Sequence, residues 1–286
     1  MLKYLMVGML AFSVLLVGCG NGPKKETLVQ KIRNGKLTVD EAYARGMRKM
    51  RDRKYQEARQ WFRLIEAHAP NSKYFATSKL RIADSYFFDK MATYIEASVE
   101  YKSFLTHFPT HPDSDYAMYQ YAMCFFTEIE SADRDQTSTW TAYTEFKNLL
   151  DRYPKSEYAE KARDKIALCQ LRLAEHEFTV GYYYFRRGQG FEVSAESRFK
   201  GIIDNYESSF DPEKTYFYLA ETLWRREKHK EAMTYYRYLH RNYPESEYRP
   251  FVLDKMARWD RIQRDGVDPG EITAGESDPI RTSDIN

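Results

Sequence analysis

The side chains that most often carry chemistry are present in this chain, but they form no familiar catalytic or metal-binding motif. Its six histidines are scattered, at His68, His107, His111, His176, His229 and His240. His176-Glu177 is followed by Phe178-Thr179-Val180, so the second histidine of a zinc-protease helix is missing. Gly188-Gln189-Gly190 is too short for a phosphate-binding glycine loop, and no Gly-x-Ser-x-Gly elbow occurs. We therefore expect no enzymatic activity, no metal and no cofactor.

One cysteine stands where bacteria attach lipid. Lys3 precedes an apolar run at Tyr4–Val17, and this run leads into Leu16-Val17-Gly18-Cys19. A short basic start, an apolar core too short for a typical membrane span and small residues at the end predict a signal peptide over residues 1–18. The last four residues resemble a bacterial lipoprotein signal, in which the cysteine is diacylated, so Cys19 is the predicted lipid anchor. Acyl chains contribute about 0.8 kcal/mol per buried CH2, so several of them hold a folded domain at a bilayer.

The residues after this cysteine suggest a location. Gly20 follows instead of aspartate, which by the familiar sorting pattern favours the outer membrane of a diderm bacterium, with the folded part on the periplasmic face. Residues 19–37 are then the lipidated cysteine and its tether. An ordinary signal peptide with a chance cysteine is the alternative.

The two other cysteines each fall within an apolar helical pattern. Cys124 adjoins Phe125, and Cys169 follows Ile166 by three residues. An oxidising periplasm would allow them to pair, but the sequence does not place their Cα atoms within bonding distance. We expect two buried free thiols, with a disulfide as the alternative.

One spacing occurs five times and predicts the elements that position these residues. An alanine is followed four residues later by an aromatic, in Ala58 and Phe62, Ala97 and Tyr101, Ala142 and Phe146, Ala195 and Phe199, and Ala232 and Tyr236. Such pairs share one face of a helix, so the small residue admits a neighbouring helix and the aromatic fills the gap beside it. Proline, which ends a helix, follows eight residues on in four copies, at Pro70, Pro109, Pro154 and Pro244. A register repeated at long intervals predicts stacked helical hairpins.

Another helix precedes each alanine. Ala220 lies twelve residues before Ala232, and Gly46 holds the same place before Ala58. This ladder of small residue, aromatic and proline resembles the tetratricopeptide repeat. The predicted fold is therefore all-α, an elongated superhelix of about five tetratricopeptide-like hairpins. The 24 tyrosines suit half-buried helices, because the ring packs while the hydroxyl stays wet. Five unrelated amphipathic helices in register by chance are the alternative.

The net charge says little about possible partners, but one segment of the chain is strongly basic. The net charge of +2 offers no global case for a nucleic-acid partner. Basic residues cluster in the first repeat, at Arg45, Arg48, Lys49, Arg51, Arg53, Lys54, Arg59 and Arg63. This cluster is either a solvated helix face or a contact for anionic lipid headgroups or an acidic partner.

A long segment without proline separates the third and fourth ladder copies. Lys161–Gly188 predicts a single helix of about 40 Å, which would link two groups of repeats rigidly. The predicted organisation is then repeats 1–3 in residues 38–158, and the linking helix with repeats 4–5 in residues 159–264. Residues 265–286 are an acidic tail rich in Gly, Pro, Ser and Thr, which we expect to be disordered.

The end of this predicted helix carries the most specific resemblance. It reads Ala174-Glu175-x-Glu177-x-x-Val180-x-x-Tyr183-Tyr184-x-x-Arg187-Gly188, and Ala195-x-x-Arg198-Phe199 follows. Together with the lipoprotein cysteine and the five repeats, this stretch resembles the BamD (ComL) family, lipoproteins of the outer-membrane β-barrel assembly machinery. The resemblance covers about Cys19 to Arg264 and leaves out the tail.

The resemblance implies a non-catalytic periplasmic scaffold that docks on the periplasmic domains of BamA. In the family the C-terminal repeats make that contact, so Tyr183, Tyr184, Arg187 and Arg198 are candidate partner-binding residues. Ser197 replaces the asparagine common before the family's arginine, which leaves the detail of the contact open. The alternative is packing between repeats for the tyrosines, and a local ion pair or helix-end role for the arginines.

The resemblance also implies a groove in the N-terminal repeats for the C-terminal signal of unfolded β-barrel outer-membrane proteins. Tyr86, Phe87 and Tyr94 are candidate lining residues, with core packing as the alternative for each. A different function is a periplasmic repeat adaptor that coordinates cell-wall synthesis with envelope constriction. Such proteins usually carry a coiled coil, and no sustained heptad occurs here. A peptidoglycan hydrolase with appended repeats would need a second domain, and we expect none from this sequence.

Overall fold

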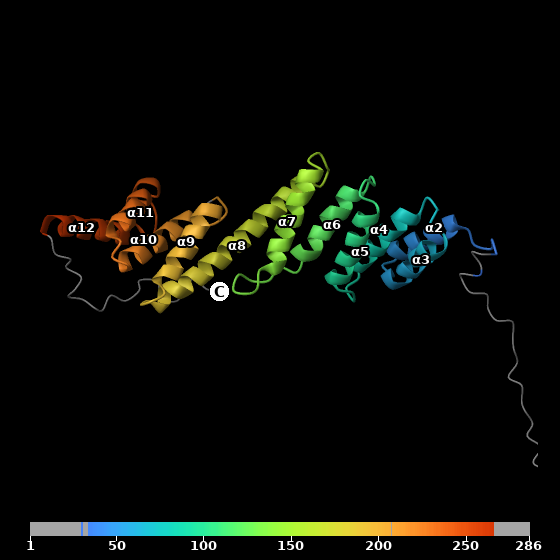
Figure 1. Cartoon of the computed structure of the whole chain (residues 1–286), viewed down its shortest axis with the longest axis horizontal. Helices are drawn as coiled ribbons and strands as arrows, with labels where there is room; N and C mark the ends of the chain where they lie inside the picture. The colour runs from blue at the N-terminus through green and yellow to red at the C-terminus, as the bar shows by residue number, and fades with distance from the viewer. Residues whose placement is uncertain (1–29, 31–33, 207, 266–286) are drawn as a thin grey trace, which may run out of the picture.

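Successive helices stack along an elongated molecule (Figure 1). The computed structural model describes Gln30 and residues 34–206 and 208–265, and every regular element of that part is helical. Within residues 34–206 and 208–265 the helices are α2 Val39–Arg51, α3 Tyr55–His68, α4 Phe75–Phe87, α5 Tyr94–His107, α6 Ser114–Phe126, α7 Thr137–Arg152, α8 Ala159–Arg187, α9 Glu192–Tyr206, α10 Pro212–Arg225, α11 His229–Asn242 and α12 Arg249–Asp265. The predicted signal peptide, Cys19 and nearly all of the predicted acidic tail lie outside the described residues.

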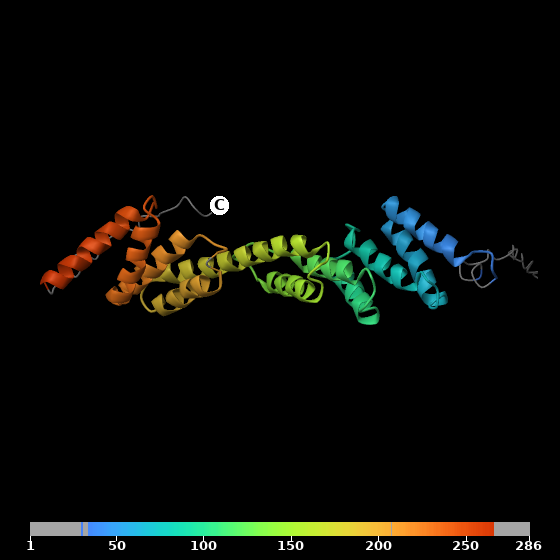
Figure 2. The same cartoon turned by 90° about the horizontal axis from the view of Figure 1, so that it is seen from above.

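Each helix packs against the next one in the chain. Five antiparallel hairpins result, from α2–α3 to α10–α11, and α12 packs against α11 at the end of the stack (Figure 2). The predicted all-α stack of tetratricopeptide-like hairpins is confirmed.

The alanine–aromatic ladder forms the inside of this stack. All ten side chains of its five copies are fully buried. Two glycines show why the facing position must be small: a Cβ on Gly46 would lie 2.6 Å from Cε1 of Phe62, and one on Gly181 would lie 2.9 Å from Cε1 of Phe199. The aromatic ring of the second helix therefore occupies the space that a side chain on the first helix would need.

Proline ends the second helix of four hairpins as the sequence predicts. The residues just before Pro70, Pro109, Pro154 and Pro244 have φ from −139° to −130° and ψ from 53° to 66°. These angles lie outside the helical region, because a following proline clashes with a helical backbone. The four chain reversals thus share one local cause.

Helix α8 joins two groups of hairpins without a break. It has 29 residues, Ala159–Arg187, so the long helix predicted at Lys161–Gly188 is confirmed to within two residues. Its first half supplies Ala162 and Cys169 to a core with α6 and α7. Its second half supplies Phe178 and Phe185 to a core with α9 and α10. One helix therefore belongs to both parts of the molecule.

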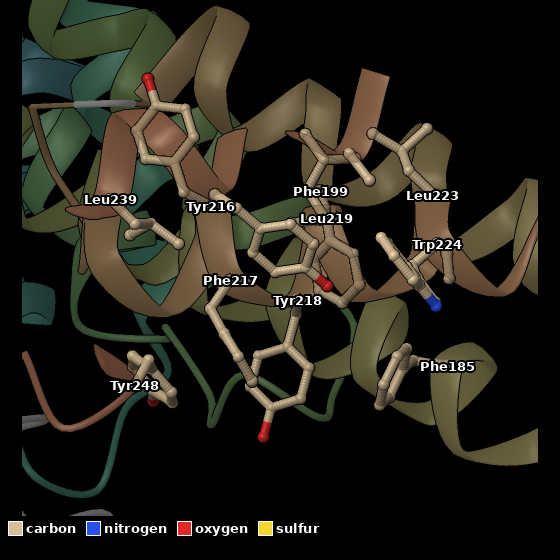
Figure 3. Close-up of a cluster of buried hydrophobic side chains, with 14 of the residues drawn as sticks. Phe185, Phe199, Tyr216, Phe217, Tyr218, Leu219, Leu223, Trp224, Leu239 and Tyr248 are labelled. Carbon is tan, nitrogen blue, oxygen red and sulfur yellow. The ribbon is translucent and has the colours of Figure 1, made fainter. Parts of the chain in front are cut away.

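The two halves are packed differently. From Ala174 onward one continuous cluster of buried apolar residues spans α8 to α12, and Figure 3 shows its aromatic centre around Tyr218. The ring of Tyr218 lies 5.1 Å from that of Tyr182 and 5.2 Å from that of Phe185, measured between centroids. Helices α2 to α7 and the start of α8 instead hold four smaller clusters.

Cys124 and Cys169 belong to two of those smaller clusters, and both are buried free thiols. The expectation of unpaired thiols is confirmed. Burial raises the pKa of each thiol to about 12, so neither is a ready nucleophile.

Candidate docking surface

Two glycines build the turn between α8 and α9. Gly188 ends α8 with φ +73° and Gly190 follows with φ +89°, backbone angles that side chains other than glycine rarely adopt. The amide of Phe191 donates to the carbonyl of Gly188 at 3.0 Å, which closes the turn. The ring of Phe191 is thereby returned to the end of α8, beside the predicted partner-binding residues.

Tyr183 and Arg187 form an exposed aromatic and cationic surface at this turn. Tyr183 is 55% exposed, and its hydroxyl accepts a 2.9 Å hydrogen bond from Nη1 of Arg187. The guanidinium lies 4.6 Å from the ring centroid of Phe191, within the range of a cation–π contact. Tyr184 is half-buried and stacks on Phe191 at 5.9 Å. We call Tyr183, Tyr184, Arg187 and Phe191 the α8–α9 surface.

Arg198 lies on the same hairpin but outside this surface. It sits seven residues beyond Phe191, roughly 10 Å further along α9. Its Nη1 donates to both carboxylate oxygens of Glu177 on α8, at 2.9 and 2.8 Å. Gly181 brings the two helices close here, because its missing Cβ would lie 3.1 Å from Cβ of Arg198. The local ion pair considered for Arg198 from the sequence is therefore present.

A buried carboxylate on α9 gathers three cations that sequence reasoning missed. Glu196 is 6% exposed and accepts hydrogen bonds from Lys200 at 2.7 Å, from Lys228 at 3.2 Å and from Arg226. Burial alone would raise the pKa of Glu196, but hydrogen bonds from Lys200 and Lys228 outweigh it and lower the pKa. Lys200 is one helical turn away, whereas the other two cations come from the α10–α11 turn. Only the pair four residues apart left a signal in the sequence.

The three predicted groove residues all pack against the buried cluster formed by α4, α5 and α6. Tyr86 on α4 contacts two arginines of α3. Cζ of Arg59 lies 4.2 Å from the centroid of its ring, and its hydroxyl accepts a 3.2 Å hydrogen bond from Arg63. Phe87 packs against the ring of Tyr94 at 5.4 Å. These contacts match the core-packing alternative for Tyr86 and Phe87, and their role as groove residues stays a prediction.

Tyr94 lines a hollow at the edge of the second and third hairpins. This hollow has a volume of about 230 Å³ and a largely apolar lining that includes Ile95, Phe125 and Thr141. Ile95, Val99 and Trp140 are large apolar side chains exposed on helices α5 and α7. Sequence reasoning did not single out these three, because an isolated apolar residue in a helix gives no sign of which way it faces.

A second buried acid joins three helices of the N-terminal half. Oδ1 of Asp84 on α4 accepts from the hydroxyls of Tyr101 on α5, at 2.7 Å, and Tyr116 on α6, at 2.9 Å. Arg81 donates to its other oxygen. Burial raises the pKa of Asp84, although Arg81 and the two tyrosines act against that rise. All of its partners come from within the stack, so Asp84 is a structural group.

Comparison with known proteins places the chain in a family. A family model described as "YfiO: Outer membrane lipoprotein" matches residues 36–223. The chain belongs to this family. It is similar to proteins named "Outer membrane protein assembly factor BamD", with 31% identity over 206 residues in Caulobacter vibrioides, which covers 72% of this chain and 65% of that protein. The protein of that name in Neisseria meningitidis serogroup B is 27% identical, over 78% of this chain and 86% of its own length. The one in Rickettsia prowazekii is 26% identical, over 86% of this chain and 94% of its own length.

Among solved structures, a tetratricopeptide-repeat protein of Thermus thermophilus covers 77% of this chain and 100% of its own length. Its identity of 13% and TM-score of 0.33 are too low to carry an argument. The YfiO family match itself includes the α8–α9 surface, Arg198 and Glu196. It ends at Leu223, before Arg226 and Lys228, so two of the three cations around Glu196 lie beyond the matched residues.

Two further properties of this family member follow from its described residues. Within them, no three His, Cys, Asp or Glu side chains gather closely enough to hold a metal ion. None of the described helices is both long and apolar enough to span a bilayer.

Proposed function

We propose that this protein is a non-catalytic lipoprotein scaffold in the assembly of outer-membrane β-barrel proteins. Its α8–α9 surface binds the periplasmic domains of BamA, and its N-terminal repeats receive unfolded barrel substrates. The proposal is supported by membership of the YfiO family and by relatives named as outer-membrane protein assembly factors. The observation that carries it is the exposed Tyr183–Arg187 pair at the end of a long helix shared by two cores.

The chemistry of the α8–α9 surface suits protein recognition. Tyrosine and arginine are enriched at the centres of protein interfaces, where a ring offers area and a guanidinium offers directed hydrogen bonds. The Arg187–Tyr183 hydrogen bond and the stack on Phe191 hold both side chains in place before a partner arrives. Less side-chain freedom is then lost on binding.

Depletion of the protein in its own cells tests the proposed function. We expect folded outer-membrane β-barrels to fall as the protein disappears, measured by heat-modifiable migration of the barrels on gels. Re-expression of the wild-type chain should restore them. Normal barrel levels after complete depletion would refute the proposal. Capture of peptidoglycan-synthesis proteins without BamA would instead favour the cell-wall adaptor.

The proposed anchor at Cys19 has its own test. Cys19→Ala removes the only thiol that follows the predicted signal peptide directly, so the mature chain should leave the membrane fraction and appear in the soluble periplasmic fraction. Retention in the membrane fraction would show that lipidation is not the tether.

A further inference from the structure

The basic residues of the first hairpin fall into two groups in the structure. One group is used in packing: Arg59 pairs with Asp89 at 2.8 Å, and Arg63 pairs with Glu100 at 2.8 Å. Both ion pairs join the first hairpin to the second. These arginines are therefore accounted for by the stack itself.

The other group is exposed at the turn between α2 and α3. Arg48, Arg51, Arg53 and Lys54 all point to solvent there, and Asp52 is the one acidic residue among positions 48–54. Lys49 is not counted, because it pairs with Glu57 at 2.6 Å. The four exposed cations and Asp52 then leave an excess charge of +3. We call Arg48, Arg51, Arg53 and Lys54 the basic tip. The first hairpin ends the stack (Figure 2), so only one side of it faces another hairpin.

Exposed apolar side chains adjoin the basic tip. The rings of Tyr55, which follows the tip, and Phe88, in the α4–α5 turn, have centroids 6.5 Å apart. Phe88 is 46% exposed and Met91, three residues on, is 92% exposed. Cations beside exposed apolar side chains are typical of surfaces that bind the interface of a membrane, where the apolar groups enter and the cations meet phosphates.

The α6–α7 turn, which follows the α2–α3 and α4–α5 turns along the stack, is acidic where the basic tip is cationic. Residues 127–136, between α6 and α7, contain Glu128, Glu130, Asp133 and Asp135 against the single cation Arg134. The hollow lined by Tyr94 and Glu128 shows that this turn adjoins the second hairpin. An anionic surface would repel it, so the membrane-binding edge ends at the second hairpin.

The length of the segment between Cys19 and the first hairpin limits how far the basic tip lies from a membrane that holds Cys19. Cys19 and the buried Leu37 are separated by 37 − 19 = 18 residues, and an extended chain spans at most about 3.3–3.6 Å per residue, or roughly 60 Å in all. If Cys19 carries lipid, the first hairpin stays within that distance of the bilayer. Even weak attraction then has effect, because the surface is always near.

We propose that the basic tip, together with Phe88 and Met91, binds the anionic phosphate headgroups of the membrane in which the protein is anchored. The occupant is a lipid surface, chosen over an acidic protein because apolar side chains flank the cations and the chain is predicted to be tethered beside lipid. The inference rests on the proposed lipid anchor. It adds that the first hairpin faces the bilayer while the acidic α6–α7 turn and the rest of the stack lean away from it.

Vesicle flotation of the chain from residue 20 onward tests the contact without the lipid anchor. This chain keeps every described helix. We expect it to float with phosphatidylcholine vesicles that contain about 30% phosphatidylglycerol and to remain unbound with phosphatidylcholine alone. Raising NaCl from about 0.1 M to about 1 M shortens the Debye length from about 10 to about 3 Å and should release it.

Two matched triple variants locate the contact. Arg48→Glu, Arg51→Glu and Lys54→Glu reverse three charges of the basic tip, and Arg53 is left alone because its φ of +56° restricts substitution. Lys230→Glu, Arg237→Glu and Arg241→Glu reverse three exposed charges on α11, at the far end of the stack. The first variant should bind at least about a hundredfold more weakly, because each cation near an anionic surface strengthens partition about fivefold. The second should bind like the wild type.

Met91→Ser tests the apolar part of the contact. We expect weaker flotation at low salt with an unchanged salt dependence, whereas Leu168→Ser, an exposed apolar residue of α8, should have no effect. Equal binding by the two triple variants, or no binding of the wild-type chain to anionic vesicles at low salt, would overturn the proposal. Either result leaves the assembly function standing, since that is tested by depletion.

Discussion

The two halves of this molecule solve the same packing problem with different means. The C-terminal half, from the middle of α8 onward, has one continuous apolar cluster centred on aromatic rings. The N-terminal half has four smaller clusters, and polar contacts such as Arg59–Asp89 and the hydrogen bonds to Asp84 join one hairpin to the next. We infer that the C-terminal half behaves as one cooperative unit, whereas hairpins of the N-terminal half loosen more independently.

Substitutions at one ladder position in each half test whether the two halves unfold differently. Phe199→Ala and Phe62→Ala each remove a fully buried ring, and each should lower the free energy of unfolding by about 3–5 kcal/mol. Hydrogen exchange should distinguish them. Phe199→Ala should weaken amide protection throughout α9 to α12, while Phe62→Ala should weaken it mainly in α2, α3 and α4. Equally local effects in both variants would contradict the single C-terminal unit.

A polar substitution in the N-terminal half tests whether its polar contacts hold the hairpins together. Asp84→Asn keeps the size of the side chain but removes the charge that faces Arg81, so we expect a loss of about 2–3 kcal/mol in unfolding free energy. Chemical denaturation measures the loss. Asp151→Asn, at an exposed carboxylate, is the control and should change little. A loss no larger than the control's would show that the polar contacts around Asp84 do not hold these hairpins together.

The acid of the C-terminal half should respond to pH. Since the pKa of folded Glu196 lies below its ordinary value of 4.5, its stabilising contribution is complete above that value and is lost as pH falls through the folded-state pKa. Glu196→Gln should therefore cost about 1–2 kcal/mol near neutral pH and progressively less as pH drops toward about 3. Thermal unfolding of wild type and variant across this range measures the difference. A difference that stays constant with pH would mean that the lost charge is not its cause.

The smallest effect on stability is expected at the α8–α9 surface. Arg187→Glu removes an exposed hydrogen bond and should change the unfolding free energy by less than about 1 kcal/mol. If the proposed docking is right, co-purification with BamA should nevertheless fall about tenfold or more. Lys161→Glu, on the N-terminal part of α8, provides an exposed control. Unchanged yield of BamA with folded Arg187→Glu protein would contradict docking at this surface.

A charge exchange separates the two possible roles of Arg198. Arg198→Glu breaks the ion pair with Glu177, and the double variant with Glu177→Arg restores a pair of opposite charges. If Arg198 only holds α9 on α8, the double variant should recover binding to BamA. If its guanidinium contacts BamA directly, the double variant should remain as weak as the single one.

The sequence was sufficient for the architecture because the signals are local. Alanine and an aromatic four residues apart, as in Ala142 and Phe146, define a buried helix face, and proline at Pro154 defines its end. The long helix was predictable within two residues because nothing in Lys161–Gly188 interrupts a helix before the glycine that ends it.

The site was harder to predict because its contacts are distant in the sequence. Glu196 meets Arg226 and Lys228 from the α10–α11 turn, some thirty residues away. Tyr86 lies near the end of α4 and packs under Arg59 of α3, whereas Tyr94 begins α5 and lines a hollow with residues of α6 and α7. These partners belong to other helices, so the local sequence does not reveal them. The predicted lipid anchor and acidic tail fall outside the described residues and stay predictions.

The continuity of α8 sets a fixed distance. At about 1.5 Å per residue, its 29 residues measure roughly 43 Å between the third hairpin and the α8–α9 turn. Both ends are held in packed cores. If the proposed function is right, a partner bound at the α8–α9 surface and a substrate bound by the earlier hairpins therefore keep a constant separation and a constant relative angle. A rotation of the molecule at one end of α8 therefore displaces the other end by an amount that the length of this helix sets.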